Sequence, residues 1–425
     1  MKQCNVAIAG LGVVGAQTAQ LLLNNQSSYA TKTGANITLK AVSARSKGKD
    51  RGFDLSSLQW CDNPVDLATM DDIDIVVEVM GGSDGPALAL TKAALSAGKH
   101  VVTANKAMIA LHGMELAQLA EDNNAQLCFE SSVAGGIPAL KILREGLAAN
   151  DIQAVSGILN GTCNYILSTM EQTGRAFDDV LSEAQALGYA EADPTFDVDG
   201  IDAAHKLAIL QSIAFAVQPN FDNLSITGIR AITDLDISYA AELGYRIRLI
   251  GRATAAGDAG VAPMLLPMGS ALASVTGPTN AVNYEATPVQ TISAMGPGAG
   301  AGPTASAVVA DIMDIASGRN TYPFGRPAID LASQSASNST AAQSSYYLRL
   351  RVTDEKGVLA DVTDVLNACD MSIETLVQKQ LEGGQDADLV MILHEASSDN
   401  LAKACDKLKT MSVVGDMSLP MAVQK

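Results

Sequence analysis

The chain has 425 residues, of which 48% are hydrophobic and 17% charged, so it forms buried cores and is not a disordered chain. At roughly 150 residues per domain, two or three domains are expected. Its 28 Lys and Arg against 46 Asp and Glu give a formal net charge of −18, and such a surface repels nucleic-acid backbones and anionic membranes.

The six cysteines include no CxxC pair and the four histidines are scattered, so we expect neither a disulfide framework nor a zinc site. This cysteine usage is typical of a reducing, cytoplasmic compartment. No apolar run approaches the roughly 18–20 residues of a membrane span. The N-terminal stretch resembles a signal peptide only superficially, because glycines interrupt its apolar part.

The first motif is a glycine turn. An apolar strand is predicted over Asn5–Ala9, followed by Gly10-Leu11-Gly12-Val13-Val14-Gly15 and a helix over Ala16–Asn24. In such a unit the three glycines allow the tight turn, the approach of a pyrophosphate and the close packing of the helix, whose N-terminus binds the phosphates. A plain glycine-rich turn is the alternative, but the position between strand and helix favours dinucleotide binding.

The rest of the N-terminal region continues the alternation of strands and helices. Strands are predicted over Ile37–Ser43, Ile73–Val79 and His100–Thr103, and a helix over Ala87–Ala97 ends at Gly98. This alternation implies right-handed crossovers and a parallel sheet. Residues 1–130 are therefore predicted to form an α/β domain of the Rossmann type, a doubly wound sheet that binds NAD(P).

The end of the second predicted strand bears on the choice of cofactor. Its sequence is Ser43-Ala44-Arg45-Ser46-Lys47, without the carboxylate that would bind the ribose 2′-hydroxyl of NAD. Arg45 and Lys47 instead predict binding of the 2′-phosphate of NADP. Two solvated surface cations are the alternative, and NAD remains possible as the cofactor.

Lys106 directly follows the strand that ends near Thr103, which places it in the crevice beyond the carboxyl edge of the sheet. A lysine there can donate a hydrogen bond to a substrate oxygen or act as an acid. Without further support, an exposed surface lysine is the simpler interpretation.

Residues 131–326 mix helical and strand-like patterns and are predicted to be an α+β substrate-binding domain. The patterns are helical over Ala139–Ala148 and Ala203–Ala216 and strand-like over Arg246–Arg252 and Val289–Ala294. Within this region Asp202 and Lys206 are four residues apart on one helix face. A surface ion pair is the simple interpretation, but the apolar run after Lys206 places the pair at the edge of a core, where carboxylates tune a proton donor.

The C-terminal part has a different composition. Residues 327–345 are poor in charge and rich in Ser, Ala, Asn and Gln, which is typical of a linker. Residues 346–425 then follow the order β-α-β-β-α-β, the split βαβ arrangement.

Several blocks together resemble the homoserine dehydrogenase family over roughly residues 3–320. They are Thr103-Ala104-Asn105-Lys106-Ala107, the segments 130–138 (ESSVAGGIP) and 157–166 (GILNGTCNYI), the spaced pattern from Ala184 to Lys206, and Gly296-Pro297-Gly298-Ala299-Gly300. The C-terminal part resembles an ACT domain, including the turn Asp354-Glu355-Lys356-Gly357-Val358-Leu359. This architecture is that of monofunctional bacterial homoserine dehydrogenases.

The resemblance implies reversible hydride transfer between L-homoserine and L-aspartate 4-semialdehyde, a step of threonine, methionine and isoleucine biosynthesis. It implies that Lys206 is the proton donor and that Lys106 lies near nicotinamide and substrate. By the same resemblance, Glu191 and Asp202 bind the substrate, with Asp197 in support, and Gly300 touches the cofactor. A sodium ion is implied at Glu130, Val133, Gly135 and Ile137, mostly through backbone carbonyls. One departure is Val13, where the family often has threonine.

The resemblance also implies a homodimer or, through paired ACT domains, a homotetramer, with threonine as the expected effector. Two alternatives stay open. One is another NAD(P)-dependent amino-aldehyde dehydrogenase on the same fold, and the other is a non-catalytic amino-acid sensor. The set of Lys106, Asp202 and Lys206 counts against the sensor.

Overall fold

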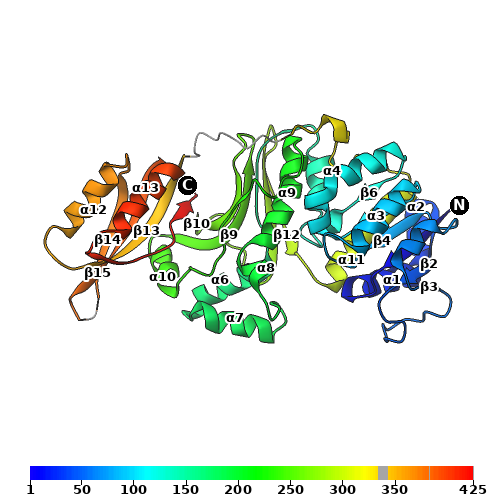
Figure 1. The fold of residues 1–425 in the computed structure, drawn as a ribbon, viewed down its shortest axis with the longest axis horizontal. Helices are drawn as coiled ribbons and strands as arrows, with labels where there is room; N and C mark the ends of the chain where they lie inside the picture. Colours follow the sequence, from blue (N-terminus) through cyan, green and yellow to red (C-terminus); the bar gives the residue numbers. More distant parts are fainter. Residues whose placement is uncertain (334–342, 382, 425) are drawn as a thin grey trace.

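The computed structural model describes residues 1–333, 343–381 and 383–424, arranged in three groups of elements along one long axis (Figure 1). Residues 334–342 of the predicted linker therefore lie outside the described residues. Its first part does not: residues 328–330 form a short 3-10 helix, and Ala332 pairs with Val217 of the middle region. Two backbone hydrogen bonds hold Ala332 in place: its amide donates to the Ala216 carbonyl, and its carbonyl accepts from the Gln218 amide.

The first group is a sheet of six strands, and its parallel pairing is as predicted. Its strands are β1 (Lys2–Ala9), β2 (Ala35–Ser43), β3 (Gln59–Cys61), β4 (Ile75–Glu78), β5 (His100–Thr103) and β6 (Leu127–Cys128). Their spatial order is β3-β2-β1-β4-β5-β6, and every pairing is parallel. The order reverses between β1 and β4, so the carboxyl edge at this point forms the crevice in which doubly wound sheets bind ligands.

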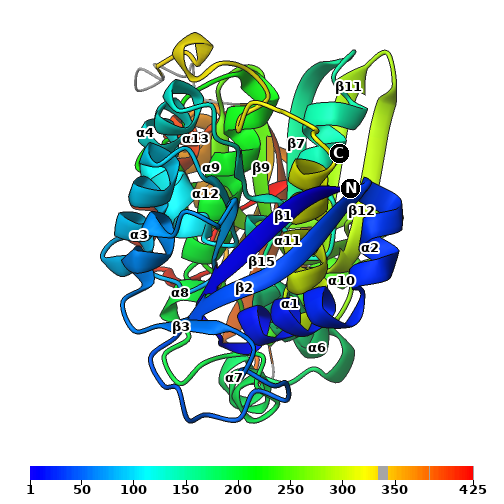
Figure 2. The same ribbon diagram turned by 90° about the vertical axis from the view of Figure 1, so that its right-hand side faces the viewer.

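Helices cover both faces of this sheet (Figure 2). They are α1 (Val13–Asn24), α2 (Gln26–Thr33), α3 (Pro86–Ser96), α4 (Lys106–Asp122) and, from much later in the chain, α11 (Ala301–Ala316). Buried residues of α11 such as Val308 and Ile312 share a core with Val6 and Ile8 of β1. The chain thus returns to the first domain from inside the region predicted as the substrate domain.

The second group is a mixed sheet with helices packed on it. Its strands are β7 (Asp151–Ile158), β8 (Ser225–Ile226), β9 (Tyr245–Thr254), β10 (Ala259–Pro267), β11 (Thr279–Thr287) and β12 (Gln290–Pro297). Its helices are α5 (Ala139–Lys141), α6 (Gly161–Thr173), α7 (Phe177–Ala186), α8 (Thr195–Val198), α9 (Ile201–Phe215) and α10 (Asp234–Glu242). The helix predicted over 139–148 is confirmed up to Gly146, because the α-helical turn Ala139–Lys141 continues as a π-helix over Ile142–Gly146.

The third group has the predicted order β-α-β-β-α-β. Its elements are β13 (Gln343–Thr353), α12 (Val358–Asn367), β14 (Ile373–Gln380), β15 (Asp386–Ser397), α13 (Ser398–Lys409), β16 (Val414–Met417) and a further strand, β17 (Met421–Val423). β17 pairs with β10 on one side and β13 on the other, so the second and third groups share one eleven-stranded sheet.

Helix α10 adds a buried polar contact between these two groups. Asp236 of α10 is fully buried and accepts hydrogen bonds from Arg349 Nε at 2.8 Å and from the Tyr347 hydroxyl at 3.0 Å. Tyr239, one turn later, donates to Asp388 at 3.0 Å. The C-terminal part, predicted to follow a linker, is therefore packed against the middle region by paired charges and a shared sheet.

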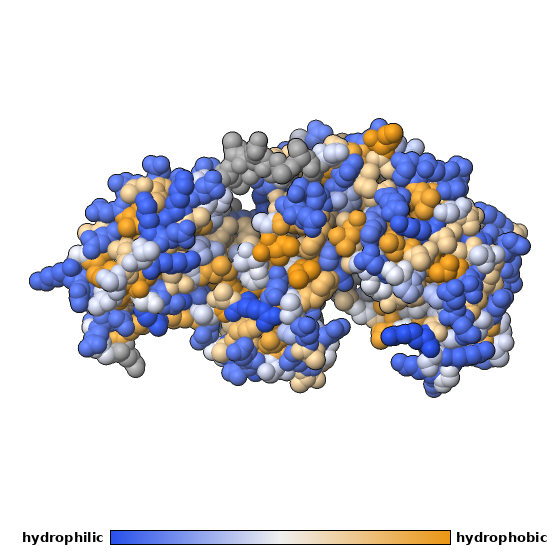
Figure 3. All heavy atoms as spheres, viewed as in Figure 1, coloured by the Kyte–Doolittle hydropathy of each residue, from blue (hydrophilic) through white to orange (hydrophobic). Residues whose placement is uncertain are grey.

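Figure 3 shows the visible face hollowed at its lower edge, between the region of α6 and α7 and the first domain. Among the described residues, no helix is both long and apolar enough to cross a membrane.

Candidate active site

The glycine turn between β1 and α1 has the geometry that a bound pyrophosphate requires. Gly10 has a φ of +98°, and a Cβ there would lie 2.6 Å from the Val79 carbonyl oxygen. A Cβ on Gly15 would lie 1.8 Å from the Gly10 oxygen, so helix and turn touch through glycine only. Gly12 has open space around it and caps α1 without a side-chain hydrogen bond. The first amides of α1 thus face open space, ready for an anion.

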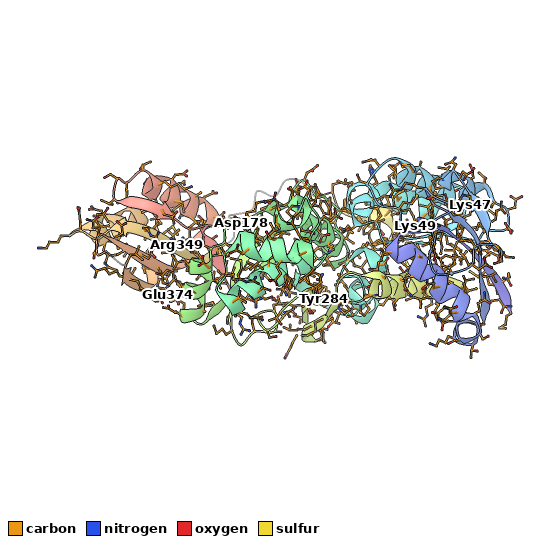
Figure 4. The ribbon with its side chains drawn as sticks, turned by 90° about the horizontal axis from the view of Figure 1, so that it is seen from below. Lys47, Lys49, Asp178, Tyr284, Arg349 and Glu374 are labelled. Atoms are coloured by element: carbon orange, nitrogen blue, oxygen red, sulfur yellow. The ribbon has the colours of Figure 1, made fainter. Side chains whose placement is uncertain are left out.

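Cations gather beyond the carboxyl end of β2. Arg45 and Lys47 are exposed, and Figure 4 shows Lys47 and Lys49 at the first-domain end of the molecule. Lys47 Nζ and the Arg51 guanidinium lie 5.9 and 5.6 Å from the ring centroid of Trp60. The aromatic face steadies this loop by cation–π attraction.

Lys106 is the first residue of α4, a helix capped by Asn105, whose side chain accepts a hydrogen bond from Met108 N at 3.1 Å. Lys106 Nζ lies 3.0 Å from Asp202 Oδ1 and 5.5 Å from the ring centroid of Phe196. The lysine is therefore not a freely solvated surface side chain.

Asp202 and Lys206 lie on α9, a helix whose residues 202–213 are all buried. Lys206 Nζ donates to Asp202 Oδ2 at 2.7 Å and to the Leu159 carbonyl oxygen at 2.7 Å. Asp202 is 5% exposed and Lys206 8%, which rules out the simple surface ion pair. An ammonium has three hydrogens, so one remains for the cavity that Lys206 lines.

The charges of this cluster support one another. Burial alone would raise the pKa of Asp202, but the ammonium groups of Lys206 and Lys106 hold it well below its ordinary range. The pKa of Asp197 is raised by burial and then by the nearby charge of Asp202. Asp202 is thus a permanent anion between two cations, and Asp197 is the carboxylate with the greater tendency to take up a proton.

These side chains line one cavity of about 630 Å³ between the first domain and the second sheet. Of the residues predicted from the sequence, it brings together Val14, Lys106, Gly135, Glu191, Asp197, Asp202, Lys206 and Gly300. Leu11 is buried next to the turn and Val13 is 73% exposed at the start of α1, and neither lines the cavity. Arg45 and Lys47 also lie outside its lining.

Gly300 enters the cavity at the N-terminus of α11 with a φ of +111°. The loop before it packs closely on the 133–137 turn, since a Cβ on Gly135 would lie 2.4 Å from the Gly298 oxygen. Glycine at position 135 thus allows this close approach, glycine at position 300 allows the positive φ, and both residues line the cavity.

Glu130, predicted to help hold a sodium ion, uses its carboxylate otherwise. Its two oxygens accept hydrogen bonds from the backbone amides of Leu140 and Lys141 at 2.9 and 3.0 Å. Burial, followed by the charge of Asp311, raises the pKa of Glu130 to about 8. Val133 and Ile137 are buried beside it. In the part of the chain that the structure describes, no cluster of three His, Cys, Asp or Glu side chains suits a metal ion.

Two asparagines belong to the site without having been singled out from the sequence. Asn160 donates to both Asp197 and Asp202, and Asn280 donates to the Leu159 carbonyl oxygen at 2.9 Å. Asn160 stands in the segment 157–166, where an asparagine before a helix indicates an N-cap. No local pattern pointed to Asn280, because its contact joins distant parts of the chain.

Known proteins resemble this chain over its whole length. Residues 10–130 match the family description "Homoserine dehydrogenase, NAD binding domain" and residues 138–313 match "Homoserine dehydrogenase". The homoserine dehydrogenase of Neisseria gonorrhoeae is 42% identical over 97% of both chains. A crystal structure of a homoserine dehydrogenase from Thiobacillus denitrificans is 40% identical, with a TM-score of 0.93 over 100% of this chain and 99% of that one.

A further solved structure is that of a hyperthermophilic archaeal homoserine dehydrogenase in complex with NADPH. It is 29% identical, with a TM-score of 0.64 over 73% of this chain and 97% of that one. The glycine turn, the buried lysine–carboxylate cluster and the full-length similarity to the Neisseria and Thiobacillus proteins point to the same family. The chain belongs to the homoserine dehydrogenase family.

Proposed function

We propose that this chain interconverts L-homoserine and L-aspartate 4-semialdehyde with Lys206 as the group that gives and takes the proton. The observation that carries the proposal is the Asp202 carboxylate between Lys106 and Lys206 at one cavity. In the reductive direction Lys206 donates a proton to the oxygen of the aldehyde as negative charge develops there. In the oxidative direction the same amine takes the proton from the hydroxyl.

Lys106 supplies the second positive charge near that oxygen. Its ion pair with Asp202 and its approach to Phe196 hold the ammonium at the cavity wall. A preorganised cation stabilises the developing oxyanion more than water does, because it needs no reorientation.

The substrate ammonium is assigned to Glu191 and Asp202, with Asp197 in support. All three carboxylates line the cavity, and Glu191 is exposed there. Carboxylates fixed in the wall orient the amino-acid end and so place the reacting carbon.

A nicotinamide cofactor fits the site, because the open space at Gly12 and the free first turn of α1 suit its pyrophosphate. When bound, it supplies or accepts the hydride. We assign the 2′-phosphate of NADP to Arg45 and Lys47, and the archaeal relative named above is in complex with NADPH. The backbone amides remain available at Val13, so the missing threonine hydroxyl leaves phosphate binding intact.

Sodium stays a prediction. With the Glu130 carboxylate bound to two backbone amides, an ion would depend on the backbone carbonyls of residues 130, 133, 135 and 137. A higher melting temperature in sodium chloride than in choline chloride would favour such an ion, and equal values would count against it.

We also propose that residues 343–424 are an ACT-type regulatory unit that binds threonine and supports a homodimer or homotetramer. The strand order β16-β13-β15-β14 around two helices is that of the split βαβ arrangement. An effector acts here only if it binds one arrangement of the units better than another.

One assay tests the proposed function. The chain is incubated with NADPH or NADH and aspartate semialdehyde, with and without threonine, and oxidation of the cofactor is followed. We expect turnover, preference for NADPH and inhibition by threonine. A faster rate with another aldehyde in a panel would favour a different amino-aldehyde dehydrogenase, and no turnover with any aldehyde would favour a sensor.

A further inference from the structure

The segment between β7 and α6 contacts both the lysine and the carboxylates of the cluster, Lys206 through Leu159 and the two aspartates through Asn160. Asn160 is 4% exposed and is the N-cap of α6, where its Oδ1 accepts a hydrogen bond from Cys163 N at 2.8 Å. Its Nδ2 donates to Asp197 Oδ1 at 2.7 Å and to Asp202 Oδ2 at 2.9 Å. The side-chain amide of Asn160 therefore caps the N-terminus of α6 with its oxygen and bridges two carboxylates with its nitrogen.

The orientation of this amide is determined by its partners. Reversal would place its oxygen against two carboxylate oxygens and its NH₂ group against the backbone amide of Cys163, so every contact would become repulsive. Both hydrogens of the NH₂ group are used, one on each carboxylate. The α6 cap thus fixes the direction in which Asn160 donates.

The bridge matters because Asp197 and Asp202 are like charges in a buried place. Asp202 Oδ2 accepts from Asn160 as well as from Lys206, while Oδ1 pairs with Lys106. Asn160 therefore helps to hold the rotamer in which one carboxylate reaches two lysines. The adjacent Leu159 carbonyl accepts from Lys206 itself, at 2.7 Å.

From these contacts we propose that Asn160 is a positioning residue, which aligns Asp202 with Lys106 and Lys206 and keeps Asp197 beside them as a second anion. The inference rests on the proposed function and adds a residue to it. Asn160 orients the acid–base group through Asp202.

The test uses two variants of the full chain. Asn160→Asp keeps an oxygen for the Cys163 amide but sets a third carboxylate against Asp197 and Asp202. The titratable groups around position 160 are then Asp202, Asp197, Lys106, Lys206 and His205, with one more carboxyl group. Neighbouring carboxyl groups cannot all ionise together, so they hold protons up to a higher pH than in wild type, and the pH profile of kcat/KM for homoserine oxidation should move about 1 pH unit upward.

Asn160→Ser keeps a capping oxygen and removes the NH₂ donor without adding charge. We expect kcat/KM for homoserine to fall about 100-fold, as for a small misplacement of a reacting group, with the pH profile unmoved and KM for NADPH within about two-fold of wild type. Asn63→Asp is the matched control, because Asn63 is an exposed N-cap asparagine that does not line the cavity.

The outcomes separate the two ideas. If the wild type does not oxidise homoserine, the proposed function fails. If the wild type is active, two results would show that the positioning role is wrong. One is a pH profile of Asn160→Asp equal to that of the wild type, and the other is a kcat/KM of Asn160→Ser equal to that of the wild type. Should Asn160→Asp not fold, Asn160→Ser decides alone. A lower melting temperature with unchanged kinetics of the folded enzyme would show that Asn160 only caps α6.

Discussion

Lys106 and Asp202 form an ion pair between two separately built parts of the molecule, with Nζ 3.0 Å from Oδ1. Lys106 begins a helix of the parallel-sheet domain, whereas Asp202 lies in the first turn of a buried helix on the second sheet. The pair is completed by Lys206 on the other carboxylate oxygen. The geometry of the proposed acid therefore depends on how the two parts are packed together.

Replacing Lys206 by alanine should lower kcat by roughly 10²–10⁴ and leave KM for NADPH nearly unchanged, because it removes a general acid and not a cofactor contact. Steady-state kinetics in both directions check this. Lys92→Ala is the control, since that lysine forms an exposed pair with Glu115. Near-normal kcat in the Lys206 variant would make the pair structural and Lys106 the leading proton donor.

Asp202→Asn removes the anion between two lysines and keeps the shape of the side chain. Because it leaves two cations with one neutral partner, we expect a loss of about 3–5 kcal/mol in the free energy of unfolding and weaker binding of homoserine. Urea unfolding and KM measurements test both. Glu115→Gln, at an exposed pair, should change neither, and an equally stable Asp202 variant would contradict the electrostatic account.

Arg45→Ala should raise KM for NADPH about ten-fold or more while changing KM for NADH little, since it removes a charge-assisted contact to a phosphate that NADH lacks. The same assay with Lys40→Ala, an exposed lysine on β2, controls for general loss of positive charge. Equal effects of the Arg45 variant on both cofactors would show that this side chain does not bind the 2′-phosphate.

His205 predicts a pH dependence of stability. Its ring is buried, stacks on Phe221 at 4.3 Å and leaves Nδ1 without a partner among the described residues. Burial and then the charge of Lys106 lower its pKa. Below about pH 6.5 the unfolded chain binds a proton that the folded chain does not. Stability should therefore fall as the pH drops, by at most about 1.4 kcal/mol per pH unit from this group.

The measurement is urea unfolding of wild type and His205→Phe between pH 8 and 5. The phenylalanine variant should lose less stability on acidification, because its ring cannot take up a proton. His394→Gln removes an exposed histidine and should follow the wild type. Parallel curves for His205→Phe and wild type would refute the prediction.

Arg349→Met should destabilise the whole chain by about 3–5 kcal/mol, because Asp236 would be left buried without its cation. Figure 4 places Arg349 in the C-terminal part of the molecule, and its Nε lies 2.8 Å from Asp236. Arg319→Met, at an exposed pair, is the control. The double variant Asp236→Asn/Arg349→Met should recover part of the loss, and a fully additive loss would contradict the coupling.

The same contacts bear on truncation after Ser344. From the sequence alone, the remaining chain is expected to stay soluble and active and to lose threonine sensitivity. The shared sheet and the buried Asp236 now predict a lower melting temperature of the truncated chain as well, since β10 loses its β17 partner. Threonine inhibition of equal strength in an active truncated chain would place the effector site elsewhere.

What could be read from the sequence about this protein depends on neighbours in the chain. The turn at Gly10 follows from glycine's freedom at positive φ, and the approach of Asp202 to Lys206 follows from the four-residue spacing on a helix. The β-α-β-β-α-β order near the C-terminus follows from hydrophobic periodicity. Each is a local property, so no knowledge of the packed fold was needed.

The tertiary structure alone decided the contacts that complete the site. Lys106 meets Asp202, the Leu159 carbonyl receives both Lys206 and Asn280, and α11 returns to the first sheet. β17 likewise joins two units that composition had separated by a linker. These contacts join residues distant in the chain. Which of many such pairs forms depends on how whole helices and sheets bury their apolar faces, and no local spacing encodes that choice.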